Sequence, residues 1–236
     1  MKHWMKCGAV VMTLLAGLAL PWAAEAKCTV NTQTIANRDG SALILRQEEC
    51  PDHDQRNIRV SYRPDAKHKA YSVLTLSQSI EEASTGGAHS IDLEADGQFE
   101  IEVRGMCGAG PNCEGTIYKL ASDKRSMFEY FSGGYADLRL QDGYLIEGGR
   151  ASCCSWEFHL YRTDATDRPI DESAMEYMVT VGVLLKEGSD QVEGSDCQVS
   201  RREGNDWKAA PPPTPGLARL CEVYGTDYRL NPATDQ

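Results

Sequence analysis

The sequence predicts a mainly β protein whose antiparallel hairpins form a compact sandwich or propeller-like domain, with little helix and with disulfide stabilisation. Apolar and polar residues alternate with a period of two along much of the chain. An Asp-Gly pair, typical of β-hairpin turns, recurs at 38–40, 95–97 and 141–143. Of the nine cysteines, eight follow residue 26. An even number of cysteines is typical of a disulfide framework in an exported chain.

Strand candidates follow this alternation in order along the chain. They are 41–46, 57–62, 71–76, 116–120, 151–162, 177–185 and 197–201. One or two helical turns are predicted at each of 77–83 and 171–175, and a short helix at 216–224.

The residues that flank two of the Asp-Gly turns allow the strand register of each hairpin to be predicted. A three-residue loop at each turn gives each hairpin one apolar face, with Gly97 in the left-handed conformation. The pairs that this register predicts are Leu93 with Phe99, Ile91 with Ile101, Leu140 with Tyr144, and Leu138 with Ile146.

Residues 1–26 have the features of a secretory signal. Lys2 and Lys6 precede an apolar run that is too short to span a bilayer comfortably, and residues 24–26 read Ala-Glu-Ala, the small-x-small form that signal peptidase cleaves. We therefore expect a mature chain that begins at Lys27, is periplasmic or secreted, and has no membrane anchor.

The mature chain divides by composition. We expect a β-rich domain over 27–208, a proline-rich linker over 209–215 and a C-terminal tail over 216–236 that is tied back through Cys221.

Acidic residues outnumber basic ones in this chain. The 24 basic and 35 acidic side chains of the whole chain become 22 and 34 after cleavage, a net charge of −12. Such a charge disfavours a nucleic-acid binder that neutralises phosphates. It favours a basic partner, because complementary fields raise the association rate.

The mature cysteines are expected to form up to four disulfides. They are Cys28, Cys50, Cys107, Cys113, Cys153, Cys154, Cys197 and Cys221. We expect Cys28 to bond Cys50, and Cys197 to bond Cys221 and so staple the tail. If 151–162 is one strand, Cys153 and Cys154 point to opposite faces and bond different partners. The chain contains no Cys-x-x-Cys pair, which is the spacing typical of a metal or redox site.

An acidic motif covers residues 92–100. Its candidate calcium ligands are Asp92, Glu94, Asp96, Glu100 and the backbone carbonyl of Gln98. Alternate carboxylates around a glycine turn can supply the oxygen ligands that calcium prefers. The motif resembles the calcium loop of integrin-like and related bacterial envelope proteins, with Glu94 and Glu100 longer than the usual residues. The alternative is the solvent face of an ordinary hairpin.

Catalytic motifs are sparse. The chain has no zincin histidine pair, no nucleophile elbow, and no Walker or dinucleotide-binding glycine pattern. We therefore expect a non-enzymatic protein. The alternative is an envelope hydrolase that uses carboxylates or His159, and it requires Glu157 or His159 to lie in a cleft with a perturbed pKa.

Ser132, Gly133, Gly134 and Tyr135 form a glycine-rich segment. Such a segment is either a mobile loop or a strand end with bulges. As a loop, it is similar to the Ser-Gly-x-x-Tyr loop of periplasmic lysozyme inhibitors, one residue shorter. Over 91–162 the chain resembles that family, some members of which are immunity proteins. The resemblance implies inhibition of a cell-wall-degrading enzyme, such as a basic muramidase, by this loop. A structural or accessory calcium-binding envelope protein is a third hypothesis.

Overall fold

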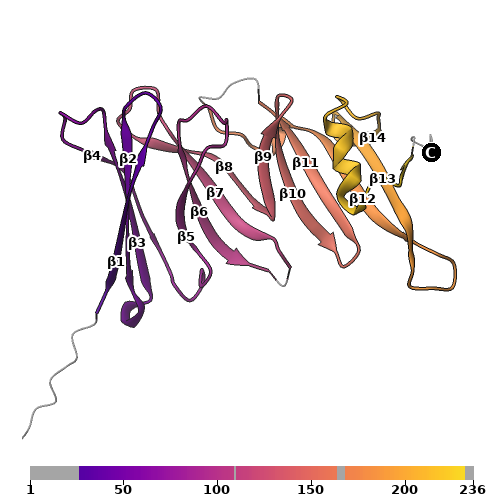
Figure 1. Cartoon of the computed structure of the whole chain (residues 1–236), viewed down its shortest axis with the longest axis horizontal. Coiled ribbons are helices and arrows are strands. Elements are labelled where there is room, and N and C mark those ends of the chain that lie inside the picture. Colours follow the sequence, from indigo (N-terminus) through magenta and orange to yellow (C-terminus); the bar gives the residue numbers. More distant parts are fainter. Residues whose placement is uncertain (1–26, 109, 164–167, 232–236) are drawn as a thin grey trace, which may run out of the picture.

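The computed structural model describes residues 27–108, 110–163 and 168–231, so the predicted signal segment lies outside the described residues. Three β-sheets follow one another along the chain (Figure 1). The first contains β1 (Thr29–Ala36), β2 (Ala42–Cys50), β3 (Gln55–Arg63) and β4 (Tyr71–Gln78), in that order. A short 3₁₀ turn, η1 (Pro51–His53), joins β2 to β3.

The second and third sheets continue the antiparallel pattern. The second contains β5 (Gly87–Ile91), β6 (Glu100–Cys107), β7 (Cys113–Leu120) and β8 (Met127–Tyr135). The third contains β9 (Asp137–Gln141), β10 (Tyr144–Ser152), β11 (Ser155–Arg162), β12 (Met175–Leu185), β13 (Val192–Glu203) and β14 (Asp206–Ala209), with β15 (Tyr228–Asn231) parallel to β13. Two 3₁₀ segments, η2 (Glu172–Ala174) and η3 (Leu217–Tyr224), complete the described elements.

Three apolar clusters pack these elements together. One joins the first and second sheets, one joins the second and third, and one lies between the third sheet and η3. Strand β10 shows why alternation produces this arrangement. Leu145 packs in the cluster between the second and third sheets. Tyr144 and Ile146, on the opposite face of the strand, pack in the cluster between the third sheet and η3. The predicted mainly β, antiparallel and disulfide-stabilised fold is confirmed, with its sheets stacked as in a sandwich.

The predicted register of the first hairpin is wrong. Ile91 pairs with Glu100, not with Ile101, and the chain between them forms a longer loop. The Asp92 carboxylate accepts backbone N–H groups from Asp96 and Gly97, which closes a wider turn than the predicted one. Gly97 has a φ of 78°, so its predicted left-handed conformation is confirmed.

The second hairpin also differs from its predicted register. Gln141 pairs directly with Tyr144, so the loop has two residues, Asp142 and Gly143, with φ values of 52° and 81°. Two consecutive positive φ angles define the tight turn that Asp-Gly favours in hairpins. The expected pairs of Leu138 and Leu140 are therefore shifted by one residue, and Leu140 pairs with Leu145.

Three disulfides are present in the described chain. The predicted bonds Cys28–Cys50 and Cys197–Cys221 are both confirmed, and Cys107–Cys113 joins β6 to β7. The expectation for Cys153 and Cys154 is wrong, because both are free and exposed. They do not lie within one strand over 151–162. They form the turn between β10 and β11, where Ser152 pairs with Ser155.

The C-terminal tail packs against the third sheet. The predicted helix over 216–224 is confirmed as η3, and its residues Leu217, Leu220 and Cys221 are between 1% and 3% exposed. The predicted turn at 171–175 is confirmed as η2. The one expected at 77–83 begins later, because β4 continues to Gln78. Among the described residues, no helix has the length and apolar character needed to cross a membrane.

Candidate functional site

The predicted calcium ligands have other partners in the structure. Glu94 forms an ion pair with Lys119 at 2.6 Å, and Asp96 accepts the backbone N–H of Gln98 at 2.7 Å. Glu100 is buried, accepts the backbone N–H of Leu93 and lies 3.7 Å from Lys119. Burial raises the pKa of Glu100 to about 7. These contacts stabilise the loop without an ion, so calcium binding stays a prediction.

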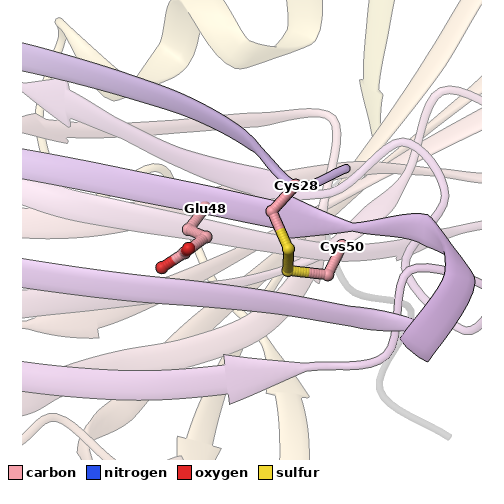
Figure 2. A group of neighbouring side chains, drawn as sticks. All are labelled: Cys28, Glu48 and Cys50. Atoms are coloured by element: carbon pink, nitrogen blue, oxygen red, sulfur yellow. A yellow bond between two sulfur atoms is a disulfide. The ribbon is translucent and has the colours of Figure 1, made fainter. Parts of the chain in front are cut away.

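Metal-ligating side chains come together elsewhere in the described chain. The ligand atoms of Cys28, Glu48 and Cys50 lie within 4.8 Å of one another (Figure 2). The two sulfur atoms are joined in a disulfide and offer no thiolate to a metal. Glu48 also binds the Arg46 guanidinium at 3.0 Å. This group is therefore a structural feature of the first sheet.

The segment from Ser132 to Tyr135 forms the end of strand β8, so the expectation of a mobile loop is wrong and the strand alternative holds. Tyr135 is fully buried, and its hydroxyl donates to Glu102 at 2.8 Å. Gly115 on β7 makes room for this ring, since a Cβ at that position would overlap the Tyr135 hydroxyl. Ser132 and Gly134 stay exposed on the strand.

A small pocket lies beside Gly134, near the end of β8. The backbone N–H of Gly134 donates to the Glu147 carboxylate on β10 at 2.9 Å. Across the hairpin, His159 on β11 is paired with Glu147 in register, and its Nδ1 lies 3.1 Å from the carboxylate. The Nε2 atom of His159 lies 2.7 Å from Glu157. The imidazole therefore bridges two carboxylates, and the Tyr161 hydroxyl donates to Glu147 at 2.8 Å.

The walls of this pocket come from three parts of the chain. Its volume is 90 Å³, and its lining residues are Asn112, Gly134, Glu147, Gly149, Arg150, Ala151, Glu157 and His159. Asn112 fixes the loop between β6 and β7 to β10. Its side chain accepts the Arg150 N–H at 2.8 Å and donates to the Arg150 carbonyl at 3.1 Å.

The electrostatics of the pocket favour an ionised Glu147. Burial alone would raise its pKa, but hydrogen bonds from His159, Tyr161 and Gly134 outweigh burial and lower the pKa of Glu147. The hydrogen bond to Glu147 raises the pKa of His159 against the effect of burial, and Glu157 adds to the rise. The raised pKa of His159 and the lowered pKa of Glu147 both favour the charged forms of these two groups.

The hydrolase hypothesis named Glu157 and His159, and the structure brings them together in a cleft. Sequence reasoning missed Glu147, which contacts the imidazole and accepts the Tyr161 hydroxyl. One signal was available, because Glu147 lies two residues after the buried Leu145 on the same strand face. A glutamate at an apolar position of an alternating strand indicates a carboxylate with buried partners.

A larger groove lies on the other side of the glycine-rich segment. Its volume is 440 Å³, and Ser132 and Gly133 line it together with residues of β4, β6 and β7. Strand β8 therefore presents its exposed end between a groove and an acidic pocket. Nearby, Glu102 repeats the arrangement of Glu147. It accepts the Tyr135 hydroxyl, pairs with His89 at 2.6 Å and pairs with Arg104 at 2.8 Å.

Fold and site together define a disulfide-bonded, mainly β protein with an acidic surface pocket at the joint between two sheets. No family model matches the chain, and no curated protein matches it. Among solved structures, the chain is similar to one described as the structure of a Xanthomonas type IV secretion system related protein. The identity is 10% and the TM-score 0.43, over 77% of this chain and 93% of that chain.

Proposed function

We propose that this chain is an exported binding protein that inhibits, or confers immunity to, a basic cell-wall-degrading enzyme such as a lysozyme. The observation that carries the proposal is the position of Ser132 and Gly134, exposed at the end of β8 between the 440 Å³ groove and the acidic pocket. The net charge and the three disulfides support a basic partner and an exported chain.

The pocket suits a single basic side chain of the partner. Ligand sites for small molecules have volumes of about 300–1,000 Å³, whereas this pocket has 90 Å³. Glu157 stands at the exposed side of the cluster, with 36% of its side chain accessible, and Glu147 lies deeper, with 10% accessible. A lysine or arginine that enters the pocket would meet both carboxylates, while the groove beside Ser132 accepts a neighbouring segment of the partner.

The same dimensions give less support to the hydrolase alternative. A sugar unit of a wall polymer needs more room than this pocket has, and an acid catalyst needs a carboxyl group with a raised pKa. The hydrogen bonds around Glu147 lower its pKa instead. Binding by charge and shape needs neither a large cleft nor a protonated carboxyl group.

The test is an inhibition assay with the chain from Lys27 to Gln236. Lysozymes of different structural families would digest a cell-wall suspension, and the loss of turbidity would be followed at low and moderate salt. We expect inhibition of at least one enzyme, weakened by Glu157→Lys and by Ser132→Trp, which place a repulsive charge and a bulky ring on the binding face. Glu187→Lys, an exposed position outside the pocket lining, is the matched control. Unaltered digestion by every enzyme would overturn the proposal.

A further inference from the structure

Two adjacent cysteines form the tip of the β10–β11 hairpin. Ser152 pairs with Ser155 in register, so Cys153 and Cys154 are the whole turn between the strands. Both side chains are exposed. The Ser152 hydroxyl accepts the backbone N–H of Cys154 at 3.2 Å and lies 2.7 Å from the Ser155 hydroxyl. The turn is therefore held in one conformation with both thiols accessible to solvent.

The backbone of the two cysteines is also held from outside the turn. The Cys153 carbonyl accepts the Arg150 guanidinium at 2.9 Å, and the Cys154 carbonyl accepts the backbone N–H of Val183 at 2.9 Å. The thiols contact each other, and the hydrogen bond from Cys153 raises the pKa of Cys154. Every other cysteine among the described residues is already in a disulfide. Within the described chain, each thiol therefore has the other as its available partner.

A phenol lies within electrostatic range of the pair. The hydroxyl of Tyr224, at the end of η3, is buried and has no hydrogen-bond partner in the described part of the chain. Burial raises the pKa of Tyr224, the Arg150 guanidinium lowers it, and the sulfur atoms of Cys154 and Cys153 raise it. The Arg150 guanidinium lowers the pKa of Cys154, but the hydrogen bond from Cys153 outweighs it.

We propose that Cys153 and Cys154 form a reversible dithiol–disulfide site that exchanges with small disulfides at the hairpin tip. One thiolate attacks a sulfur atom of the small disulfide and releases the first small thiolate, which leaves a mixed disulfide on the protein. The second thiolate then attacks the protein sulfur and closes the Cys153–Cys154 bond, releasing the second small thiolate. The two cysteines lose two electrons and two protons, and the small disulfide becomes two thiols.

The short distance between neighbouring Cα atoms makes this bond more reducible than an ordinary disulfide. Neighbouring Cα atoms across a trans peptide are about 3.8 Å apart, and ordinary disulfides join Cα atoms about 4.4–6.8 Å apart. A bond between adjacent cysteines therefore stores strain and has a higher reduction potential. The site goes beyond the proposed function and does not depend on it.

The experiment equilibrates the chain from Lys27 to Gln236 with reduced and oxidised glutathione in a series of ratios. Free thiols are then blocked with iodoacetamide, and the peptides are analysed by mass spectrometry. The peptide with Cys153 and Cys154 is expected to change from two blocked thiols to an internal disulfide within the series, while the other three disulfides stay intact. Cys153→Ser and Cys154→Ser should each stop at a mixed disulfide with glutathione.

The proposal is overturned if both thiols remain open to blocking in oxidised glutathione alone. Two separate mixed disulfides with glutathione, or a bond from either cysteine to one of the other six, would also overturn it.

Discussion

The two carboxylates that flank His159 differ in burial, and truncating each one separately tests the site geometry. Glu147 accepts the Tyr161 hydroxyl at 2.8 Å and contacts His159 at 3.1 Å, with 10% of its side chain exposed. In Glu147→Ala, the Tyr161 hydroxyl stays buried without its acceptor, which costs about 1–3 kcal/mol, and the lost hydrogen bond to a charged imidazole costs about 1.5–3 kcal/mol. We expect a loss of about 3 kcal/mol or more in the free energy of unfolding.

Glu157→Ala is the matched control, because it removes the other partner of the same imidazole. Glu157 is 36% exposed, and exposed ion pairs contribute about 0–1 kcal/mol. Urea unfolding at pH 6, followed by circular dichroism, would measure both losses, with unchanged m values showing that the denatured state is the same. Tyr161→Phe should partly restore the stability of Glu147→Ala by removing the unpaired hydroxyl. Equal losses in the two single variants would refute the reasoning.

Four further predictions follow from other contacts. Replacing Cys197 and Cys221 by alanine opens a loop with a sequence separation of 24, and it should lower the free energy of unfolding by about 3 kcal/mol in guanidinium titrations. The raised pKa of His159 stabilises the folded state. This contribution is complete below about pH 6.5 and is lost as the pH rises through the folded-state pKa. The free energy of unfolding measured across this pH range should show the loss, and His159→Gln should remove the pH dependence. Gly115→Ala should destabilise the chain by about 1–3 kcal/mol, measured by urea titration, by displacing the ring that occupies the space of its Cβ. Millimolar calcium should raise the melting temperature if residues 92–100 bind the ion, and an unchanged value would contradict that prediction.

Alternation in the sequence was sufficient to predict most of the strands that are buried on at least one face. Strands β2, β3, β4, β7 and β12 all overlap predicted segments. Strand β1 was missed because nearly every residue in it is exposed, and it carries Thr, Asn and Gln where a buried strand would carry apolar residues. It is an edge strand that pairs with β2 alone. Pairing of this kind depends on the neighbouring strand and leaves little pattern in its own residues.

For the glycine-rich segment, the sequence left a mobile loop and a strand end both open, and the strand end is correct. Two consecutive glycines favour a loop when only local preferences are considered, and the structure places them within β8. A Cβ at Gly133 would overlap the Glu147 carboxylate, so the glycine is needed for contact between the second and third sheets. No reading of the local sequence reveals this, because Glu147 follows Gly133 by fourteen positions and lies on another sheet.

Buried glutamates connect neighbouring strands at the point where the proposed binding face lies. Glu147 on β10 receives the backbone N–H of Gly134 from β8 and the side chains of β11, so one carboxylate joins two sheets. Within the second sheet, Glu102 on β6 receives the Tyr135 hydroxyl from β8. A buried carboxylate with hydrogen-bond donors from several elements stabilises the one arrangement that keeps all the donors in place. Other arrangements cost free energy, because a lost partner leaves a buried charge unpaired. The end of β8 is therefore rigid before any partner arrives, and a rigid surface loses less conformational entropy when it binds.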